Sequence, residues 1–238
     1  MIMYNPWHGC HKYSEGCQNC YMFYFDSVRG VDSNIVKKTN DFNLPIKKDR
    51  YGKFKIESGQ SLQVCLTSDF FIEEADEWRN DVWKMIKERQ DLQFTLFTKR
   101  ANRILTNLPK DFTEFYNHVE FAVTCENQKR LDERMPYLAS LPTKNISLLL
   151  SPMLEEMDID KILKTEKIKK VYISGENYKN ARVLDFDWVK KIQKQCKDNS
   201  IKLEFFHTGS KFIKDGRLYT IPYSKGKSQA KLANIDLD

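Results

Sequence analysis

Three cysteines in one short segment are the residues of this chain that best indicate a chemistry. Cys10, Cys17 and Cys20 follow a C-x6-C-x2-C spacing, and a glycine precedes each of the first two. Three thiolates in one loop can bind three irons of a [4Fe–4S] cluster, whereas clusters that only carry electrons usually have four cysteine ligands. The spacing therefore predicts a cluster whose fourth iron is open to a substrate or cosubstrate.

Zinc is the main alternative for this segment. C-x2-C also occurs in zinc sites, and His8 or His11 could complete a Cys3His set. Structural zinc sites usually combine two short ligand pairs, and no second C-x2-C or H-x3-H follows downstream. Six cysteines in 238 residues, without an apolar signal segment, are not typical of a disulfide scaffold. The cluster is favoured, with zinc or no metal as the alternatives.

The other three cysteines are predicted to be structural. Cys65 lies in an apolar strand-like run, and Cys196 falls on the same helix face as Trp188 and Ile192. Both are expected to be small buried hydrophobic residues, the usual role of a free cysteine. Cys125 ends another apolar run, where it could face a site, but a core position is favoured.

Composition sets the broad class. With 41% hydrophobic and 13% aromatic residues, the chain can bury a sizeable core, and we expect a single domain over 1–238. No run approaches the eighteen or so apolar residues that a membrane span needs, so a reduced, cytoplasmic protein without membrane contact is expected. The net charge of +6 permits a nucleic-acid partner without requiring one.

Apolar strand-like runs alternate with amphipathic helical segments along the chain. Near-continuous apolar strands between amphipathic helices are typical of a parallel sheet covered by helices. The pattern predicts an α/β fold, a partial (β/α) barrel of six or seven parallel strands, with a basic hairpin insertion at about 37–59 and a basic tail at about 211–238. Strands are expected at 2–4, 63–67, 93–98, 119–124, 146–150, 170–174 and 203–207, and helices at 21–28, 74–89, 101–108, 128–141, 159–164 and 187–197.

Polar residues follow most of these strands. The active sites of β/α barrels form at the carboxyl ends of the strands, so these residues and the cysteine segment, which follows the first strand, are expected to converge on one mouth. The residues concerned are Ser68-Asp69, Lys99-Arg100, Glu126-Asn127, Ser151-Pro152, Ser174-Gly175-Glu176-Asn177 and His207.

The motifs in this order resemble a known family. The chain is similar to an uncharacterised phage and bacterial three-cysteine family that is placed with the radical S-adenosylmethionine (SAM) superfamily. The resemblance extends over nearly the whole chain. It rests on Trp7-His8-Gly9-Cys10, Ser14-Glu15-Gly16-Cys17-Gln18-Asn19-Cys20-Tyr21, Thr67-Ser68-Asp69-Phe70-Phe71, Leu96-Phe97-Thr98-Lys99-Arg100, Val123-Thr124-Cys125-Glu126-Asn127-Gln128, Leu150-Ser151-Pro152-Met153-Leu154, Ile173-Ser174-Gly175-Glu176 and Asp187-Trp188-Val189.

The resemblance implies a radical-SAM-like barrel and an enzyme. Cys10, Cys17 and Cys20 would bind a [4Fe–4S] cluster, and the amino and carboxylate groups of SAM would chelate the open iron. An electron from a reductant such as ferredoxin or flavodoxin would cleave SAM to a 5′-deoxyadenosyl radical, which abstracts hydrogen from a substrate. The protein would orient the cofactor and exclude water.

This segment departs from the usual signature in two ways. The superfamily spacing is C-x3-C-x2-C, and the aromatic residue before the last cysteine is replaced by Asn19, with Tyr21 as a substitute near the adenine. Contacts to SAM are therefore assigned by chemistry alone. We expect Lys99 or Arg100 at the SAM carboxylate, Asp69 at its ammonium, Glu126 or Asn127 at its ribose, and Glu176 and His207 on the substrate side.

The substrate is indicated only by charge. The insertion carries seven Lys and Arg against three acids between 37 and 57, and the tail interleaves aromatic and basic residues, as single-strand binders do. A nucleotide or nucleic acid is one substrate hypothesis, and solvated edges of a basic protein are the simpler explanation of both patches. A peptide or small molecule also fits the sequence. The alternative from another class is a non-catalytic, zinc-stabilised module that binds nucleic acid or protein.

Overall fold

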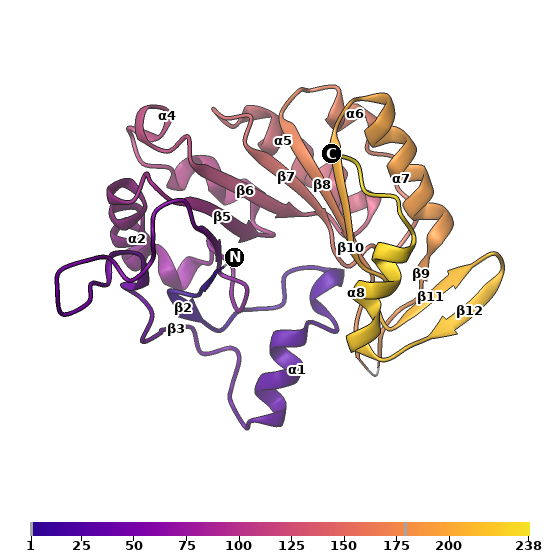
Figure 1. Ribbon diagram of the computed structural model, residues 1–238, viewed down its shortest axis with the longest axis horizontal. Helices are drawn as coiled ribbons and strands as arrows, with labels where there is room; N and C mark the ends of the chain where they lie inside the picture. Colours follow the sequence, from indigo (N-terminus) through magenta and orange to yellow (C-terminus); the bar gives the residue numbers. More distant parts are fainter. Residues whose placement is uncertain (1, 179) are drawn as a thin grey trace. The chain divides into compact units, whose positions relative to one another are not determined.

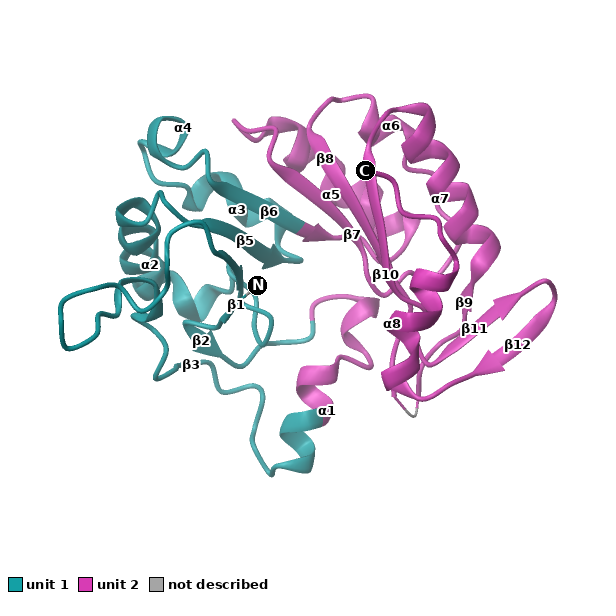
Figure 2. Ribbon diagram, in the orientation of Figure 1, with its two compact units in different colours: residues 1–12, 25–122 teal, residues 13–24, 123–238 magenta. Residues whose placement is uncertain are grey.

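The structure is a computed structural model that describes residues 2–178 and 180–238. The chain forms two compact units, each described by itself below: unit 1 is Met1–Lys12 with Phe25–Ala122, and unit 2 is Tyr13–Tyr24 with Val123–Asp238 (Figure 2). The cysteine segment is therefore divided, with Cys10 in unit 1 and Cys17 and Cys20 in unit 2. The single domain expected from the sequence stays a prediction.

Seven strands make up the main sheet, in the order β1-β4-β5-β6-β7-β8-β10 (Figure 1). Adjacent strands pair in parallel, as in the in-register contacts of Leu62 with Ile2 and with Phe94. The predicted α/β class and partial barrel of parallel strands are confirmed. The strands are β1 (Ile2–Tyr4), β4 (Ser61–Val64), β5 (Gln93–Thr98), β6 (Val119–Thr124), β7 (Ile146–Leu150), β8 (Ile168–Ser174) and β10 (Lys202–His207).

The segments between the strands form helices, and their apolar residues recur at helical spacing. In α7, Val189, Ile192 and Cys196 are buried at intervals of three and four residues, which gives the helix one apolar face. No helix in the described part of the chain is both long and apolar enough to cross a membrane. These helices are α2 (Asp76–Glu88), α3 (Ala101–Ile104), α4 (Phe112–Phe115), α5 (Gln128–Ser140), α6 (Asp160–Leu163) and α7 (Phe186–Asp198).

The cysteine segment begins in a small antiparallel ribbon and ends in a helix. Gly9 has φ +102°, and a Cβ there would overlap the carbonyl oxygen of Ile35, so only glycine fits before Cys10. The elements are β2 (Trp7–His8), which pairs with β3 (Lys37–Lys38), the 3-10 turn η1 (Glu15–Cys17) and α1 (Tyr21–Val28).

The basic insertion is held by one buried arginine. Arg89, at the end of α2, donates to the carbonyls of Pro45 (2.5 Å) and Ile56 (2.8 Å), one on each side of the predicted hairpin. The predicted hairpin is present as a single antiparallel bridge between Lys48 and Phe54. Before it lies the 3-10 turn η2 (Leu44–Ile46).

The basic tail folds onto unit 2, which was not predicted from the sequence. It forms β11 (Lys211–Lys214), β12 (Arg217–Thr220) and α8 (Tyr223–Leu232), and β11 also pairs with the short β9 (Leu184–Asp185). After α8, Leu237 and Leu203 exchange two backbone hydrogen bonds of 2.9 Å, and Asp236 accepts from the amide of Phe205 (2.8 Å). The chain after α8 thus covers part of β10, the last strand of the sheet.

The cysteines outside the loop are core residues. Cys65, Cys125 and Cys196 are completely buried, and burial raises the pKa of Cys196 to about 12. The predicted buried positions of these three thiols are confirmed.

Candidate functional site

The backbone around Cys10 is fixed by residues that follow β4. The amide of Gly9 donates to the carbonyl of Thr67 (3.2 Å), and the hydroxyl of Ser68 donates to the carbonyl of Gly9 (2.5 Å). The amide of Cys10 donates to the carbonyl of Ser33 (2.8 Å). A strand end of unit 1 therefore positions the first cysteine.

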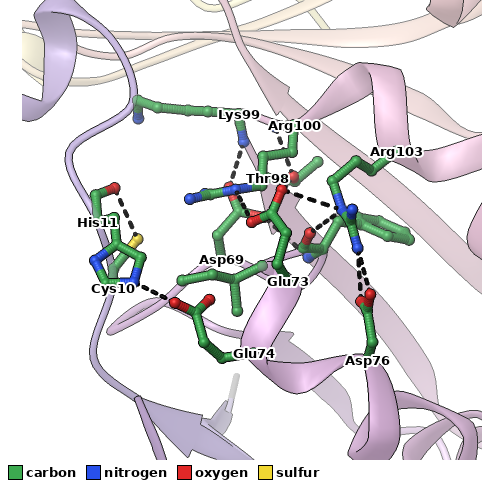
Figure 3. A network of polar contacts seen from close by, with 12 residues as sticks. Cys10, His11, Asp69, Glu73, Glu74, Asp76, Thr98, Lys99, Arg100 and Arg103 are labelled. Atoms are coloured by element: carbon green, nitrogen blue, oxygen red, sulfur yellow. Dashed lines mark hydrogen bonds and ion pairs between the residues drawn. The ribbon is translucent and has the colours of Figure 1, made fainter. Parts of the chain in front are cut away.

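Asp69 organises the polar residues beside it (Figure 3). It is 4% exposed, and its carboxylate accepts from the Thr98 hydroxyl (2.6 Å) and from the amides of Phe71 (2.9 Å) and Lys99 (2.8 Å). The Arg100 guanidinium pairs with it at 3.1 Å. The structure thus brings together three of the predicted site residues, Asp69, Lys99 and Arg100, from two strand ends. Both carboxylate oxygens of Asp69 already accept hydrogen bonds from the protein itself.

Arg100 places a positive charge near Cys10. The guanidinium is buried and also pairs with Glu73 at 3.3 Å. Burial lowers the pKa of Arg100, but the negative charges of Asp69, Cys10 and Glu73 outweigh burial and raise it above its ordinary value. A cation beside a thiol favours the thiolate, which is the metal-binding form.

Two histidines of the same segment are paired with carboxylates. Nε2 of His8 lies 2.8 Å from Asp26, and Nε2 of His11 contacts Glu74. Histidines that bind metals commonly have one ring nitrogen held in this way. Both pairs lie in unit 1, with Cys10.

In unit 2, a completely buried carboxylate holds the backbone before Cys17. Glu126, just after β6, accepts from the amide of Gly16 (3.0 Å) and pairs with Arg134 of α5 (2.8 Å). Arg134 also donates to the carbonyl of Thr124 (2.5 Å) and to the hydroxyl of Ser14 (3.1 Å). A Cβ on Gly16 would lie 3.1 Å from the Glu126 carboxyl carbon, so glycine permits this close approach.

A second buried carboxylate holds the residue before Cys20. Glu176, just after β8, accepts from the side-chain amide of Asn19 (2.9 Å) and pairs with Arg182 (2.5 Å). Arg182 reaches on to the carbonyl of Glu15 (3.0 Å). Burial raises the pKa of Glu176, but the hydrogen bonds from Arg182 and Asn19 outweigh it and lower the pKa. The carboxylate is therefore ionised and is used to hold the cysteine segment.

The start of α5 provides a third attachment. Arg130 forms two hydrogen bonds to the Glu15 carboxylate (2.7 and 2.9 Å), and they lower the pKa of Glu15 to about 2. The Asn127 side chain accepts from the amide of Arg130 (2.9 Å) and so caps the helix. Asn127 was predicted as a ribose contact, and the structure places its oxygen in this cap.

Cys17 and Cys20 belong to one turn, in which the amide of Cys20 donates to the carbonyl of Cys17 (3.3 Å). Residues three apart in such a turn lie near each other. Among residues 2–178 and 180–238, no group of three or more His, Cys, Asp or Glu side chains is arranged as a metal site. The donor chemistry nevertheless fits an iron–sulfur cluster, because all three cysteines are thiols and two are preset in one turn.

Tyr21 follows Cys20 as the first residue of α1, and it is 42% exposed. His207, at the end of β10, stacks on Tyr223 at 5.0 Å. Its Nε2 donates to the Tyr223 carbonyl (3.0 Å) and its Nδ1 accepts from the Gly209 amide (2.9 Å), so these contacts favour a structural role.

The residues that contact Glu126 and Glu176 were not predicted from the sequence. Arg134 and Arg182 neutralise Glu126 and Glu176, and Asn19 was regarded only as a departure from a motif. Arginines at positions 130 and 134, four apart at the start of a helix, were the available signal, since such residues share a helix face.

Comparison with known proteins places the chain in a family. A family model described as "Protein of unknown function (DUF5131)" matches residues 2–232. A search of the curated proteins and a search of the solved structures found no match. The match covers nearly the whole chain, and the protein therefore belongs to the DUF5131 family.

Proposed function

We propose that the protein is a radical SAM-type enzyme in which Cys10, Cys17 and Cys20 bind a [4Fe–4S] cluster. The observation that carries the proposal is that two buried, arginine-paired carboxylates hold the residues next to two of the cysteines: Glu126 accepts from the backbone amide of Gly16, before Cys17, and Glu176 accepts from the side-chain amide of Asn19, before Cys20. Burying a charge costs several kcal/mol unless it is well paired. Two such pairs beside two of the three cysteines support a role in holding these thiols in place.

The chain's own residues prepare the ligands and set their charge. Glu126 and Glu176 fix the turn that carries two thiols, and the strand end after β4 fixes Cys10. Arg100 supplies a positive charge that favours a thiolate at Cys10. When bound, the cluster and SAM supply one-electron cleavage and hydrogen abstraction, with the electron coming from a ferredoxin or flavodoxin.

The occupied side chains narrow the contacts proposed for SAM. Asp69 and Arg100 are paired with each other, so Lys99, which is half-buried, is the preferred cation for the SAM carboxylate. Glu126 and Asn127 hold Gly16 and the start of α5, so we propose that they position the cysteine turn rather than bind ribose. Tyr21 remains the proposed neighbour of the adenine.

Structural zinc is the second candidate, in a module that binds a partner without catalysis. The observation in its favour is that His8 and His11 each have Nε2 held by a carboxylate, in the same unit as Cys10. A Cys3His site is chemically reasonable for zinc. It predicts a colourless protein that does not respond to SAM.

Metal analysis of protein purified without oxygen tests the proposal. We expect about four irons and four sulfides per chain, little zinc, and an electron paramagnetic resonance spectrum of the reduced protein that SAM changes. Cys17→Ala should lose the iron, whereas the matched control Cys196→Ala, a core thiol far along the sequence, should keep it. Zinc without iron, and no response to SAM, would refute the proposal and favour the zinc module.

A further inference from the structure

Four aromatic rings of unit 2 stack in series. The centroids of Tyr24 and Tyr178 are 5.0 Å apart, those of Tyr178 and Tyr223 5.4 Å, and those of Tyr223 and His207 5.0 Å. The planes of neighbouring rings differ by only 18°, 20° and 23°. We call these four residues the tyrosine ladder.

The ladder lies partly at the surface, unlike the aromatic core of unit 1. Tyr24 is 46% exposed and Tyr223 is 53% exposed, and Tyr21, near the ladder, is 42% exposed. Tyr178 has φ +73°, a left-handed conformation that is uncommon for a bulky residue. The fold therefore tolerates backbone strain while holding this ring between its two neighbours.

A basic stripe continues from the ladder along α8. Lys227 and Lys231 follow Tyr223 by four and eight residues, so helical spacing puts them on one side of the helix with that ring. Both lysines are exposed, and neither forms an ion pair within the described residues. By contrast, Lys190 and Lys194 of α7 each pair with an aspartate.

Helix α8 is seated closely on the end of β10. A Cβ on Gly226 would overlap the imidazole of His207, and the Gly226 carbonyl accepts from the amide of Thr208 (3.3 Å). Glu176, which precedes Tyr178 by two residues, is paired with Arg182 and adds no unbalanced negative charge. The rings and the lysine stripe thus form one fixed, positively charged surface.

We propose that the tyrosine ladder, with Lys227 and Lys231, binds single-stranded nucleic acid. Tyr178 and Tyr223 each lie between two stacked rings, so the ring on which a base of any sequence can stack is Tyr24, which ends the series and is 46% exposed, while the lysines neutralise the phosphates. A duplex keeps its base faces stacked on one another, so a stacking surface selects single strands. Because the amide of Tyr24 donates to the carbonyl of Cys20 (3.2 Å), the ladder begins one helical turn from Cys20, and the bound strand lies on the Cys20 side of unit 2. Single-stranded nucleic acid is then the substrate class of the proposed enzyme, and calling it a substrate rests on that proposed function. The binding itself needs no cluster.

Fluorescence anisotropy with labelled single-stranded DNA and RNA measures this binding. Tyr24→Ala should weaken it by about 5- to 150-fold, the effect of losing one base–aromatic stack. Tyr24→Phe, which keeps the ring, should bind nearly as well as the native chain. Tyr137→Ala is the matched control, since Tyr137 is 47% exposed on α5.

The salt dependence tests the lysine stripe separately. Removing one lysine that neutralises a phosphate of a single strand lowers the slope of log affinity against log salt by about 0.7, so Lys227→Gln with Lys231→Gln should lower it by about 1.4. The pair Lys190→Gln with Lys194→Gln changes the net charge equally and should leave the slope unchanged.

Three results would overturn the inference: no binding at low salt, equal effects of Tyr24→Ala and Tyr137→Ala, or a duplex bound as tightly as a single strand. Iron content and the SAM response are measured on the same preparation. Normal iron without nucleic-acid binding would refute this surface alone. Binding by a protein without iron would support the surface and refute the proposed enzyme.

Discussion

Replacing Glu126 by glutamine tests the anchor of the cysteine turn most directly. Glu126 is 0% exposed and Arg134 is 4% exposed, and their charged atoms lie 2.8 Å apart. Glu126→Gln keeps the size of the side chain but leaves the Arg134 charge buried without its counterion. It also removes a charged acceptor for the amide of Gly16.

The structure sets the size of the effect. Removing one partner of a buried ion pair typically destabilises a protein by about 3–5 kcal/mol. In a chain of this length each kcal/mol shifts Tm by about 2–4 °C, so Tm should fall by roughly 6–20 °C. Because Gly16 precedes Cys17, the iron content should fall as well.

Thermal unfolding followed by circular dichroism gives the first quantity, and iron analysis gives the second. Adding Arg134→Met to Glu126→Gln removes the uncompensated charge and should recover part of the lost stability. Lys144→Gln is a surface control, since Lys144 and Glu166 are 73% and 81% exposed, and its effect should be close to zero. A Tm within about 2 °C of the native value, below the shift for 1 kcal/mol, would show that Glu126 is not an anchor.

Three further predictions concern the same segment. Gly9→Ala should lose metal and lower Tm, because the added Cβ would overlap backbone atoms. The control Gly52→Ala is also at positive φ but has open space around it, so its Tm should fall only modestly and its metal content should be unchanged. Arg130→Gln should reduce the free energy of unfolding at neutral pH. The pairing lowers the pKa of Glu15 to about 2 from 4.5, so the difference in unfolding free energy between variant and native chain, measured by denaturant titration, should be constant above about pH 4.5 and shrink below it. A constant difference at all pH values would exclude this pairing. In metal-free native protein, iodoacetamide should label Cys10 and Cys20, which are partly exposed, but reach the buried Cys196 only after unfolding, as peptide mass spectrometry can check. Early labelling of Cys196 would contradict its burial.

The order of the main elements was predictable from the hydrophobic periodicity of the sequence. The strands at 93–98, 119–124 and 146–150 and the helix at 21–28 coincide with their predicted bounds. The small elements were not predictable in this way. The pairing of Trp7 with Lys38 and of Phe212 with Tyr219 depends on tertiary contacts over segments too short to show a period.

The location of charged residues at strand ends was predictable, but the groups that these residues contact were not. Charged residues at strand ends indicated Asp69, Glu126 and Glu176, since function concentrates there in this architecture. Their hydrogen-bond partners could not be inferred, because Gly16 and Asn19 meet Glu126 and Glu176 from distant parts of the sequence. A strand-end carboxylate looks the same in a sequence whether it faces a ligand or holds a loop.

The cover over β10 has a consequence for synthesis of the chain. An edge strand presents unpaired amides and carbonyls that can recruit another chain, and Leu237 and Asp236 occupy those of Leu203 and Phe205. These covering residues leave the ribosome about thirty residues after the strand, which takes seconds at ordinary elongation rates. During that interval nascent chains are exposed to intermolecular strand pairing. Slower elongation through 208–237 should therefore lower the yield of dispersed protein without changing the stability of the chains that fold.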